Sequence, residues 1–238
     1  MLNRRDLFKF AAFAAGGRRN GALRGVFATL TVSGALAREI EFVNGSGAHG
    51  VVFPWSELPL DQRMAAAEIV MARATGAVIL CVQGDDLRST RLYARHAESL
   101  RPAAVMAAPL RDTAKLIEHY RAIAGECGIP LMAHLTGGMG LEFALRASDE
   151  IPALRFVRDE AGHTLSRISE YKRAAPDLAV FTSGFGRAMP DEIERGASGV
   201  MTPVRFAGAY VRIWNDCLAG RRKRAIADLM RLQFASSA

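Results

Sequence analysis

The sequence has 238 residues, half of them apolar, with a formal net charge of +7 at pH 7 and a mean hydropathy of +0.08. This length allows one large core, so we expect a single domain from residue 21 to residue 238. No run of about 18 uncharged apolar residues occurs, so the sequence indicates no membrane span. The basic residues cluster near the chain ends without interleaved aromatics, and we therefore expect no nucleic-acid partner.

The first residues contain a pair of arginines, Arg4 and Arg5, followed by an apolar stretch from Phe10 to Ala15. This pattern resembles a twin-arginine export signal; the alternative is an amphipathic N-terminal helix. We expect residues 1–20 to stand outside the folded domain. A working signal would make the protein periplasmic, and otherwise it would be cytoplasmic.

Three cysteines stand far apart and form no CxxC pair, so neither a zinc site nor a disulfide framework is indicated. We expect them to be small buried apolar side chains. They are Cys81, Cys127 and Cys217.

Eight short apolar runs rich in β-forming residues recur along the chain, with starts 21 to 27 residues apart. They begin near Gly25, Gly50, Ala77, Ala103, Pro130, Ala153, Leu178 and Gly199. Segments with helical periodicity separate them, most clearly between Arg111 and Cys127. Apolar strands that alternate with amphipathic helices predict an α/β protein with parallel strands. Eight unbroken units favour a (β/α)8 TIM barrel with outer helices over a doubly wound open sheet.

Several boundaries can be predicted. The first helical segment, Gly34 to Val43, is short, and Asn44 to Gly50 reads as a turn. Aspartates mark two helix starts, and two helices should follow the last strand. The starts are Asp85-Asp86 and Asp112-Thr113, the final helices lie near Phe206 to Leu218 and Gly220 to Phe234, and His96 and His119 should lie on helix surfaces.

Chemistry in such a barrel sits at the carboxyl ends of the strands, where this chain carries most of its polar strand-end residues. The densest cluster follows the sixth run, where three charges come in succession. Charges are costly to bury unless they are paired or used, so this end should open on a polar cavity for a charged ligand. We take His134 and Arg158 as candidate catalytic residues, and Trp55, Ser56, Glu57, Asp159, Glu160, Ser183 and Gly184 as candidate substrate-binding residues.

Each candidate has a structural alternative. Arg158 suits a bidentate pair with a carboxylate, or it neutralises the neighbouring acids. His134 suits general acid or base catalysis, or it is merely hydrogen-bonded. Trp55 would cover a ligand or pack at the barrel mouth, and Glu57 would orient its loop or remain solvated. The turn beginning at Gly184 would approach a ligand or simply join a strand to a helix.

A divalent metal held by His134, Asp159 and Glu160 would permit metal-assisted chemistry. Their spacing matches no recognised metal motif, and we expect neither a metal nor another cofactor.

Five stretches, in order, resemble the family of dihydrodipicolinate synthase and N-acetylneuraminate lyase. They are Gly47 to Val52 leading to Glu57, Tyr93 to Glu98 followed by Ala104 to Met106, His119 to Pro130, Ile151 to Gly162, and Gly196 to Met201. The resemblance implies a (β/α)8 barrel that handles pyruvate through a Schiff base on a strand-six lysine. It also implies a strand-five tyrosine and a Gly-Thr-Thr-Gly-Glu motif that binds the carboxylate; the family's extra C-terminal helices are absent here.

This chain departs from that pattern. The lysine position matches Arg158, the tyrosine position matches His134, and only Glu57 survives from the glycine-threonine motif. A second tyrosine position, after strand four, falls near Leu110-Arg111. An imine requires a neutral amine, and guanidinium stays charged. The lysines are few and none is a substitute: Lys9, Lys115, Lys172 and Lys223.

The resemblance therefore implies a lyase-family protein, of the aldolase or dehydratase type, that acts on or binds a 2-oxo acid such as pyruvate. The alternative is a non-catalytic descendant that binds a small carboxylate or serves as an oligomer partner. A homo-oligomer is possible on either hypothesis.

Overall fold

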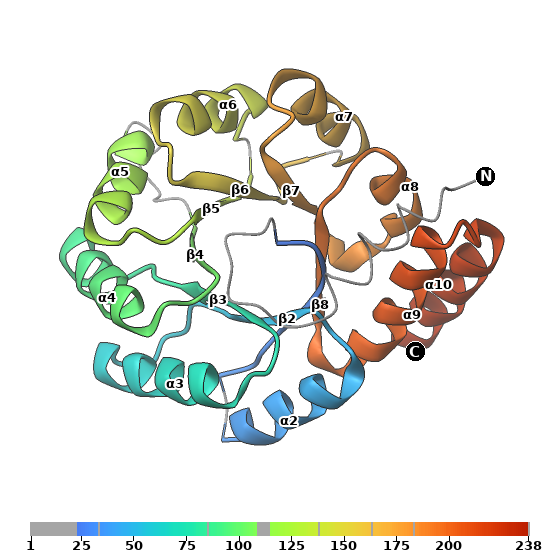
Figure 1. Ribbon diagram of the computed structural model, residues 1–238, viewed down its shortest axis with the longest axis horizontal. Coiled ribbons are helices and arrows are strands. Elements are labelled where there is room, and N and C mark those ends of the chain that lie inside the picture. The colour runs from blue at the N-terminus through green and yellow to red at the C-terminus, as the bar shows by residue number, and fades with distance from the viewer. Residues whose placement is uncertain are drawn as a thin grey trace, which may run out of the picture.

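A computed structural model describes residues 23–237, except residues 33, 85, 109–114, 138, 163 and 183. Eight parallel strands close into a barrel in chain order (Figure 1). They are β1 (Gly25–Thr29), β2 (Gly50–Phe53), β3 (Ala77–Cys81), β4 (Ala104–Ala107), β5 (Leu131–Leu135), β6 (Leu154–Asp159), β7 (Ala179–Thr182) and β8 (Gly199–Pro203). The predicted (β/α)8 barrel is confirmed, and every strand begins within one residue of its predicted start. The stretch with the predicted export signal lies outside the described residues.

Helices form a ring around the barrel, and α9 and α10 lie side by side (Figure 1). They are α2 (Leu36–Ser46), α3 (Leu60–Arg73), α4 (Leu87–Leu100), α5 (Leu116–Glu126), α6 (Leu141–Glu150), α7 (Thr164–Ala174), α8 (Met189–Glu194), α9 (Ala207–Leu218) and α10 (Arg222–Ser237). The two helices predicted after the last strand are thus present. No helix within the described ranges is long and apolar enough to cross a membrane.

Strand residues alternate between two apolar cores, as parallel strands with both faces covered require. One core fills the barrel interior; its larger members are Phe27, Val52, Ile79, Met106, Met132, Phe156, Phe181 and Met201. The other lies between the strands and the helices, where Val51, Leu80, Val105 and Leu135 meet the helical layer. Knowing which face a strand residue occupies therefore tells whether it points into the barrel.

Three strands begin with glycine at positions where the fold leaves no room for a side chain: β1 with Gly25, β2 with Gly50 and β8 with Gly199. A Cβ atom at Gly50 would lie 2.1 Å from the carbonyl oxygen of Ala77, and one at Gly199 would lie 2.5 Å from the Phe181 ring. That ring packs against Phe27 with 5.5 Å between centroids. The glycines thus let neighbouring backbone and aromatic rings close this end of the barrel.

The first helix is short, as predicted, but the prediction that it ends at Val43 and that a turn begins at Asn44 was wrong. Helix α2 continues to Ser46 and ends at Gly47, which has the left-handed φ of +77°. The turn-forming residues are used within the helix: the Asn44 amide donates to the Arg73 carbonyl at 2.9 Å, and the Ser46 hydroxyl donates to the Val43 carbonyl at 2.7 Å. Their propensity for turns was overridden by these bonds.

The predicted start of α4 is confirmed at Asp86. Its side chain accepts from the Ser89 backbone at 2.6 Å, and the Ser89 hydroxyl reaches back to the Asp86 backbone, which forms a capping box. The other expected start, Asp112-Thr113, lies outside the described residues, and α5 begins at Leu116. His119 was expected on the surface of α5, but it is buried beside Tyr120.

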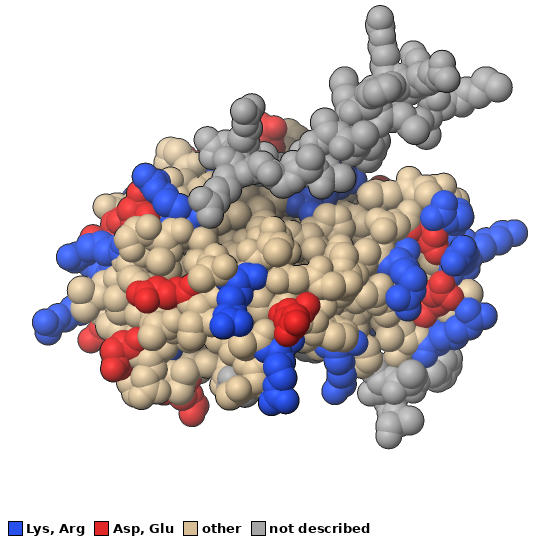
Figure 2. All heavy atoms as spheres, turned by 60° about the horizontal axis from the view of Figure 1, so that its bottom comes forward, with Lys and Arg blue, Asp and Glu red and all other residues tan. Residues whose placement is uncertain are grey.

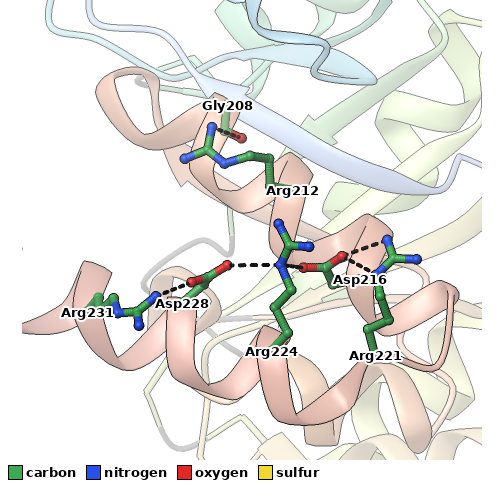
Figure 3. A network of polar contacts seen from close by, with 7 residues as sticks. All are labelled: Gly208, Arg212, Asp216, Arg221, Arg224, Asp228 and Arg231. Carbon is green, nitrogen blue, oxygen red and sulfur yellow. Dashed lines mark hydrogen bonds and ion pairs between the residues drawn. The ribbon is translucent and has the colours of Figure 1, made fainter.

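The basic run at the start of α10 fastens this helix to its neighbours (Figure 3). Buried Asp216 on α9 forms ion pairs with Arg221 at 2.6 Å and with Arg224 at 3.2 Å. Arg222 pairs with Asp191 and Glu194 around α8, at 2.6 and 2.7 Å. These arginines therefore have acidic partners within the fold.

Basic and acidic side chains are mixed on the face of the molecule drawn in Figure 2. Figure 2 shows Lys and Arg interspersed with Asp and Glu, without a broad patch of one sign among the described side chains on that face. The described cysteines are all free; Cys81 and Cys127 are buried, and Cys217 is half-buried.

Candidate functional site at the carboxyl end of the barrel

The centre of the candidate site is a triad of side chains on β5 and β6. His134 and Arg158 are partners in the register of these strands, and they share the face of Met132 and Phe156, which fill the barrel interior. Both reach Glu160, just beyond the end of β6: His134 Nε2 lies 2.6 Å from Oε2, and Arg158 Nη2 donates to Oε1 at 2.8 Å. The structure thus brings together three of the predicted residues from strands five and six.

The charge of Glu160 is stabilised by these contacts. The hydrogen bond from His134 and the charges of Arg158 and His134 lower the pKa of its carboxyl to about 2, against the opposing effect of burial. The side chains are mostly buried, with 13% of Arg158, 17% of His134 and 28% of Glu160 exposed. At neutral pH the triad therefore holds an ionised carboxylate between a guanidinium and an imidazole.

Asp159, expected to bind substrate, lies on the opposite face of β6. Its Oδ2 atom accepts from Arg167 Nε at 2.6 Å and from the Tyr171 hydroxyl at 3.0 Å, both on α7. Its Oδ1 atom accepts from the backbone of Ala161 at 2.9 Å. With only 3% of its side chain exposed, Asp159 holds α7 against the barrel. It does not face the interior with its two neighbours.

Six buried polar atoms without a hydrogen-bond partner occur on segments at this end of the barrel. Two belong to arginines, two belong to the loops after β2 and β3, and two are threonine hydroxyls near the ends of β7 and β8. They are Arg158 Nε, Arg63 Nε, Ser56 Oγ, Gln83 Oε1, Thr182 Oγ1 and Thr202 Oγ1. Because buried polar groups are nearly always hydrogen-bonded, orphans at one end of the barrel indicate a place where a ligand would supply the partners.

Arg63 and Gln83 were not predicted as site residues. Arg63 lies in the first turn of α3, is 3% exposed, and donates from Nη2 to the Gln83 carbonyl. The guanidinium stacks on Tyr93, 4.7 Å from its ring centroid. The spacing of Arg63, Ala67 and Val70 along α3 was the available signal, since it places the arginine on the buried face of the helix.

The thiol of Cys81 lies within the electrostatic influence of both arginines. It belongs to the interior core, and burial raises its pKa. The backbone of Gln83, the Arg63 guanidinium, the backbone of Trp55 and the Arg158 guanidinium lower that pKa, in this order. Both arginines therefore act on the same point inside the barrel, and the thiol remains neutral at pH 7.

The remaining candidates lie around this cluster or apart from it. Trp55 is 40% exposed, so its ring does not fill the barrel as packing. Glu57 is exposed on the same loop and has no ion pair or hydrogen bond to another described residue. Gly184 is exposed in the turn after β7, with a left-handed φ of +64°. Ser183 lies outside the described residues.

The possible metal site does not assemble from the residues proposed for it, because Asp159 faces away from His134 and Glu160. Within the described part of the chain, no group of three or more histidine, cysteine, aspartate or glutamate side chains is placed to hold a metal ion.

Several solved structures share this architecture. A dihydrodipicolinate synthase from Rhodopseudomonas palustris aligns with a TM-score of 0.77 and 20% identity, over 87% of this chain and 79% of its own. An N-acetylneuraminate lyase from Fusobacterium nucleatum aligns with a TM-score of 0.79 and 16% identity, over 90% and 82% of the two chains. A prophage protein of the dihydrodipicolinic acid synthase family from E. coli K12, in complex with pyruvate, has a TM-score of 0.79 and 16% identity, over 90% and 81%.

The chain has the fold of the dihydrodipicolinate synthases and N-acetylneuraminate lyases. No protein-family model matches the sequence, and comparison with curated protein sequences finds no match either. The resemblance read from the sequence is therefore confirmed for the dihydrodipicolinate synthase fold, at identities that leave the chemistry open. This chain carries the triad of His134, Arg158 and Glu160 inside that barrel.

Proposed function

We propose that this protein is a divergent relative of the dihydrodipicolinate synthases that binds a 2-oxo acid such as pyruvate at the carboxyl end of its barrel, without forming an imine. Arg158 carries the proposal. Its guanidinium is directed into the barrel from the end of β6, and its Nε atom has no protein partner. A carboxylate there would complete a charge-assisted hydrogen bond.

None of the described lysines is placed to supply the amine that an imine would require. The described lysines all belong to the outer helical layer: Lys115 precedes α5, Lys172 is on α7, and Lys223 is on α10. The Lys172 ammonium donates to the Leu178 carbonyl at 2.8 Å, and the other two side chains are exposed. Arg158 stays protonated and holds a carboxylate as an ion pair instead.

Lyase activity without an imine would fall to His134. Its Nε2 atom lies against the ionised Glu160, which orients the ring, and a histidine so placed can transfer a proton at the carbon next to a ketone. The second candidate function is a non-catalytic binding protein. It is favoured by the fact that both carboxylate oxygens of Glu160 are already occupied by His134 and Arg158.

The first test is treatment with pyruvate and borohydride followed by intact-mass analysis, on the unaltered protein, on Arg158→Lys and on Arg155→Lys. Arg155 is an exposed residue of the same strand and serves as the matched control. We expect an adduct on Arg158→Lys alone. An adduct on the unaltered protein would overturn the non-imine mechanism.

Thermal unfolding with and without pyruvate then tests binding, because a ligand of the native state raises the unfolding temperature. We expect stabilisation of the unaltered protein that Arg158→Gln removes. Absence of both stabilisation and a trapped adduct on Arg158→Lys would refute the proposed site. A lyase would release pyruvate from an aldol substrate and would lose this activity in His134→Gln. A binding protein would release no pyruvate.

A further inference from the structure

Arg63 is a buried cation without an anionic partner. Its side chain is 3% exposed, and its recorded contacts are the Gln83 carbonyl and the face of Tyr93. Among the residues that the structure describes, no carboxylate pairs with it. A buried charge left unpaired is strongly unfavourable, so such cations are normally matched by an anion.

Three candidate groups within the described ranges, a thiol and two carboxylates, do not supply that anion. The Cys81 thiol is neutral at physiological pH, because burial raises its pKa. Glu160 is already shared between His134 and Arg158. Glu57, the acidic residue of the β2 loop, is exposed to solvent.

Arg63 is fixed rather than free to swing away. The Tyr93 hydroxyl donates to the backbone carbonyl of Arg63 at 3.1 Å, and the ring supports the guanidinium from one side. The Nη2 atom is held by Gln83, which leaves the buried Nε atom without an acceptor. The Gln83 amide oxygen and the Ser56 hydroxyl, also orphaned, belong to the adjoining loops.

We infer that the site takes a 2-oxo dicarboxylic acid, whose two carboxylates are bound by Arg158 and Arg63. This inference rests on the proposed function and deepens it, since Arg158 would hold the carboxylate beside the ketone. Arg63, in the first turn of α3, would bind the distal carboxylate. A monocarboxylate such as pyruvate leaves Arg63 without its counter-charge and therefore binds more weakly.

Calorimetric titration with 2-oxoglutarate and with pyruvate tests this assignment. We expect the unaltered protein to bind 2-oxoglutarate at least about tenfold more tightly than pyruvate, as expected for an added charge-assisted hydrogen bond. Arg63→Gln should abolish the preference, because it should weaken 2-oxoglutarate binding by more than it weakens pyruvate binding. Arg73→Gln, which removes an exposed arginine at the end of the same helix, should change neither affinity.

A preference for pyruvate, or a 2-oxoglutarate preference that survives in Arg63→Gln, would overturn the inference and leave the proposed function standing. Binding of neither acid to the unaltered protein would instead refute the proposed function. Circular dichroism establishes whether Arg63→Gln folds. If it does not, Arg63→Lys keeps the charge but loses the planar fork, and it should weaken 2-oxoglutarate binding more than pyruvate binding. Equal weakening of both ligands would overturn the inference.

Discussion

His134 Nε2 lies 2.6 Å from Glu160 Oε2, and this hydrogen bond is the largest cause of the lowered pKa of that carboxyl. Together with Arg158 it lowers the pKa of Glu160 to about 2, whereas the same carboxyl in an unfolded chain titrates near 4.5. A carboxyl whose pKa is depressed on folding stabilises the native state above its unfolded pKa. That stabilisation is lost as the pH falls from about 4.5 to about 2.

We therefore predict that Glu160→Gln is less stable than the unaltered protein at pH 7, by roughly 2 kcal/mol after allowance for solvent screening. The difference should shrink as the pH is lowered from 4.5 towards 2, because the unaltered protein alone loses the contribution. Urea unfolding at several pH values measures it. Glu142→Gln, which changes an exposed glutamate on α6, provides the control. The prediction would be contradicted if the difference in unfolding free energy between Glu160→Gln and the unaltered protein did not change with pH.

Asp159 should contribute to stability without contributing to ligand binding. Its carboxylate is buried and paired with Arg167 and Tyr171, so Asp159→Asn leaves the arginine without its counter-charge. We expect a loss of about 3 kcal/mol in the free energy of unfolding. Asp149→Asn, on the exposed face of α6, should be nearly neutral. Reduced pyruvate affinity in a stably folded Asp159→Asn protein would instead assign Asp159 to the site.

The strands were predictable because parallel strands buried on both faces require continuous apolar runs, and this chain marks their starts with small residues such as Gly50 and Gly199. His134, Arg158 and Glu160 were also predictable as site residues, because functional groups of such barrels lie at the carboxyl ends of the strands. The direction of Asp159 could have been read from the alternation of a strand, which places it on the face opposite Arg158.

Arg63 was harder to find because it comes from a helix rather than a strand end. Its place on the buried stripe of α3 is visible in the sequence, but its lack of an acidic partner is a property of the folded neighbourhood. The extension of α2 through Asn44 was missed for a related reason. Its turn-forming side chain bonds to Arg73 and Thr75, residues about thirty positions away, which local propensity does not register.

Asp216 should anchor the C-terminal helix. It lies on α9, is 4% exposed, and forms ion pairs with both Arg221 and Arg224 at the start of α10. Asp216→Asn would leave both guanidinium groups without a buried acceptor charge, and we expect a loss of about 2–3 kcal/mol. The measurement is hydrogen exchange along α10, which should accelerate there first. Asp228→Asn removes only more exposed pairs and should cost less than about 1 kcal/mol. Equal effects of the two substitutions would contradict this role.

Gly50 should be required for closure of the barrel. An added Cβ would lie 2.1 Å from the Ala77 carbonyl oxygen, a backbone atom of the adjacent strand that cannot move without breaking the β2 to β3 pairing. We expect Gly50→Ala to cost roughly 2–3 kcal/mol through overpacking. Gly45→Ala is the matched control, because this helical glycine has open space around its Cβ position, and the substitution should stabilise α2 by about 0.5–1 kcal/mol. Urea denaturation of both variants measures the difference, and a Gly50→Ala protein as stable as the parent would show that β2 and β3 can separate without penalty.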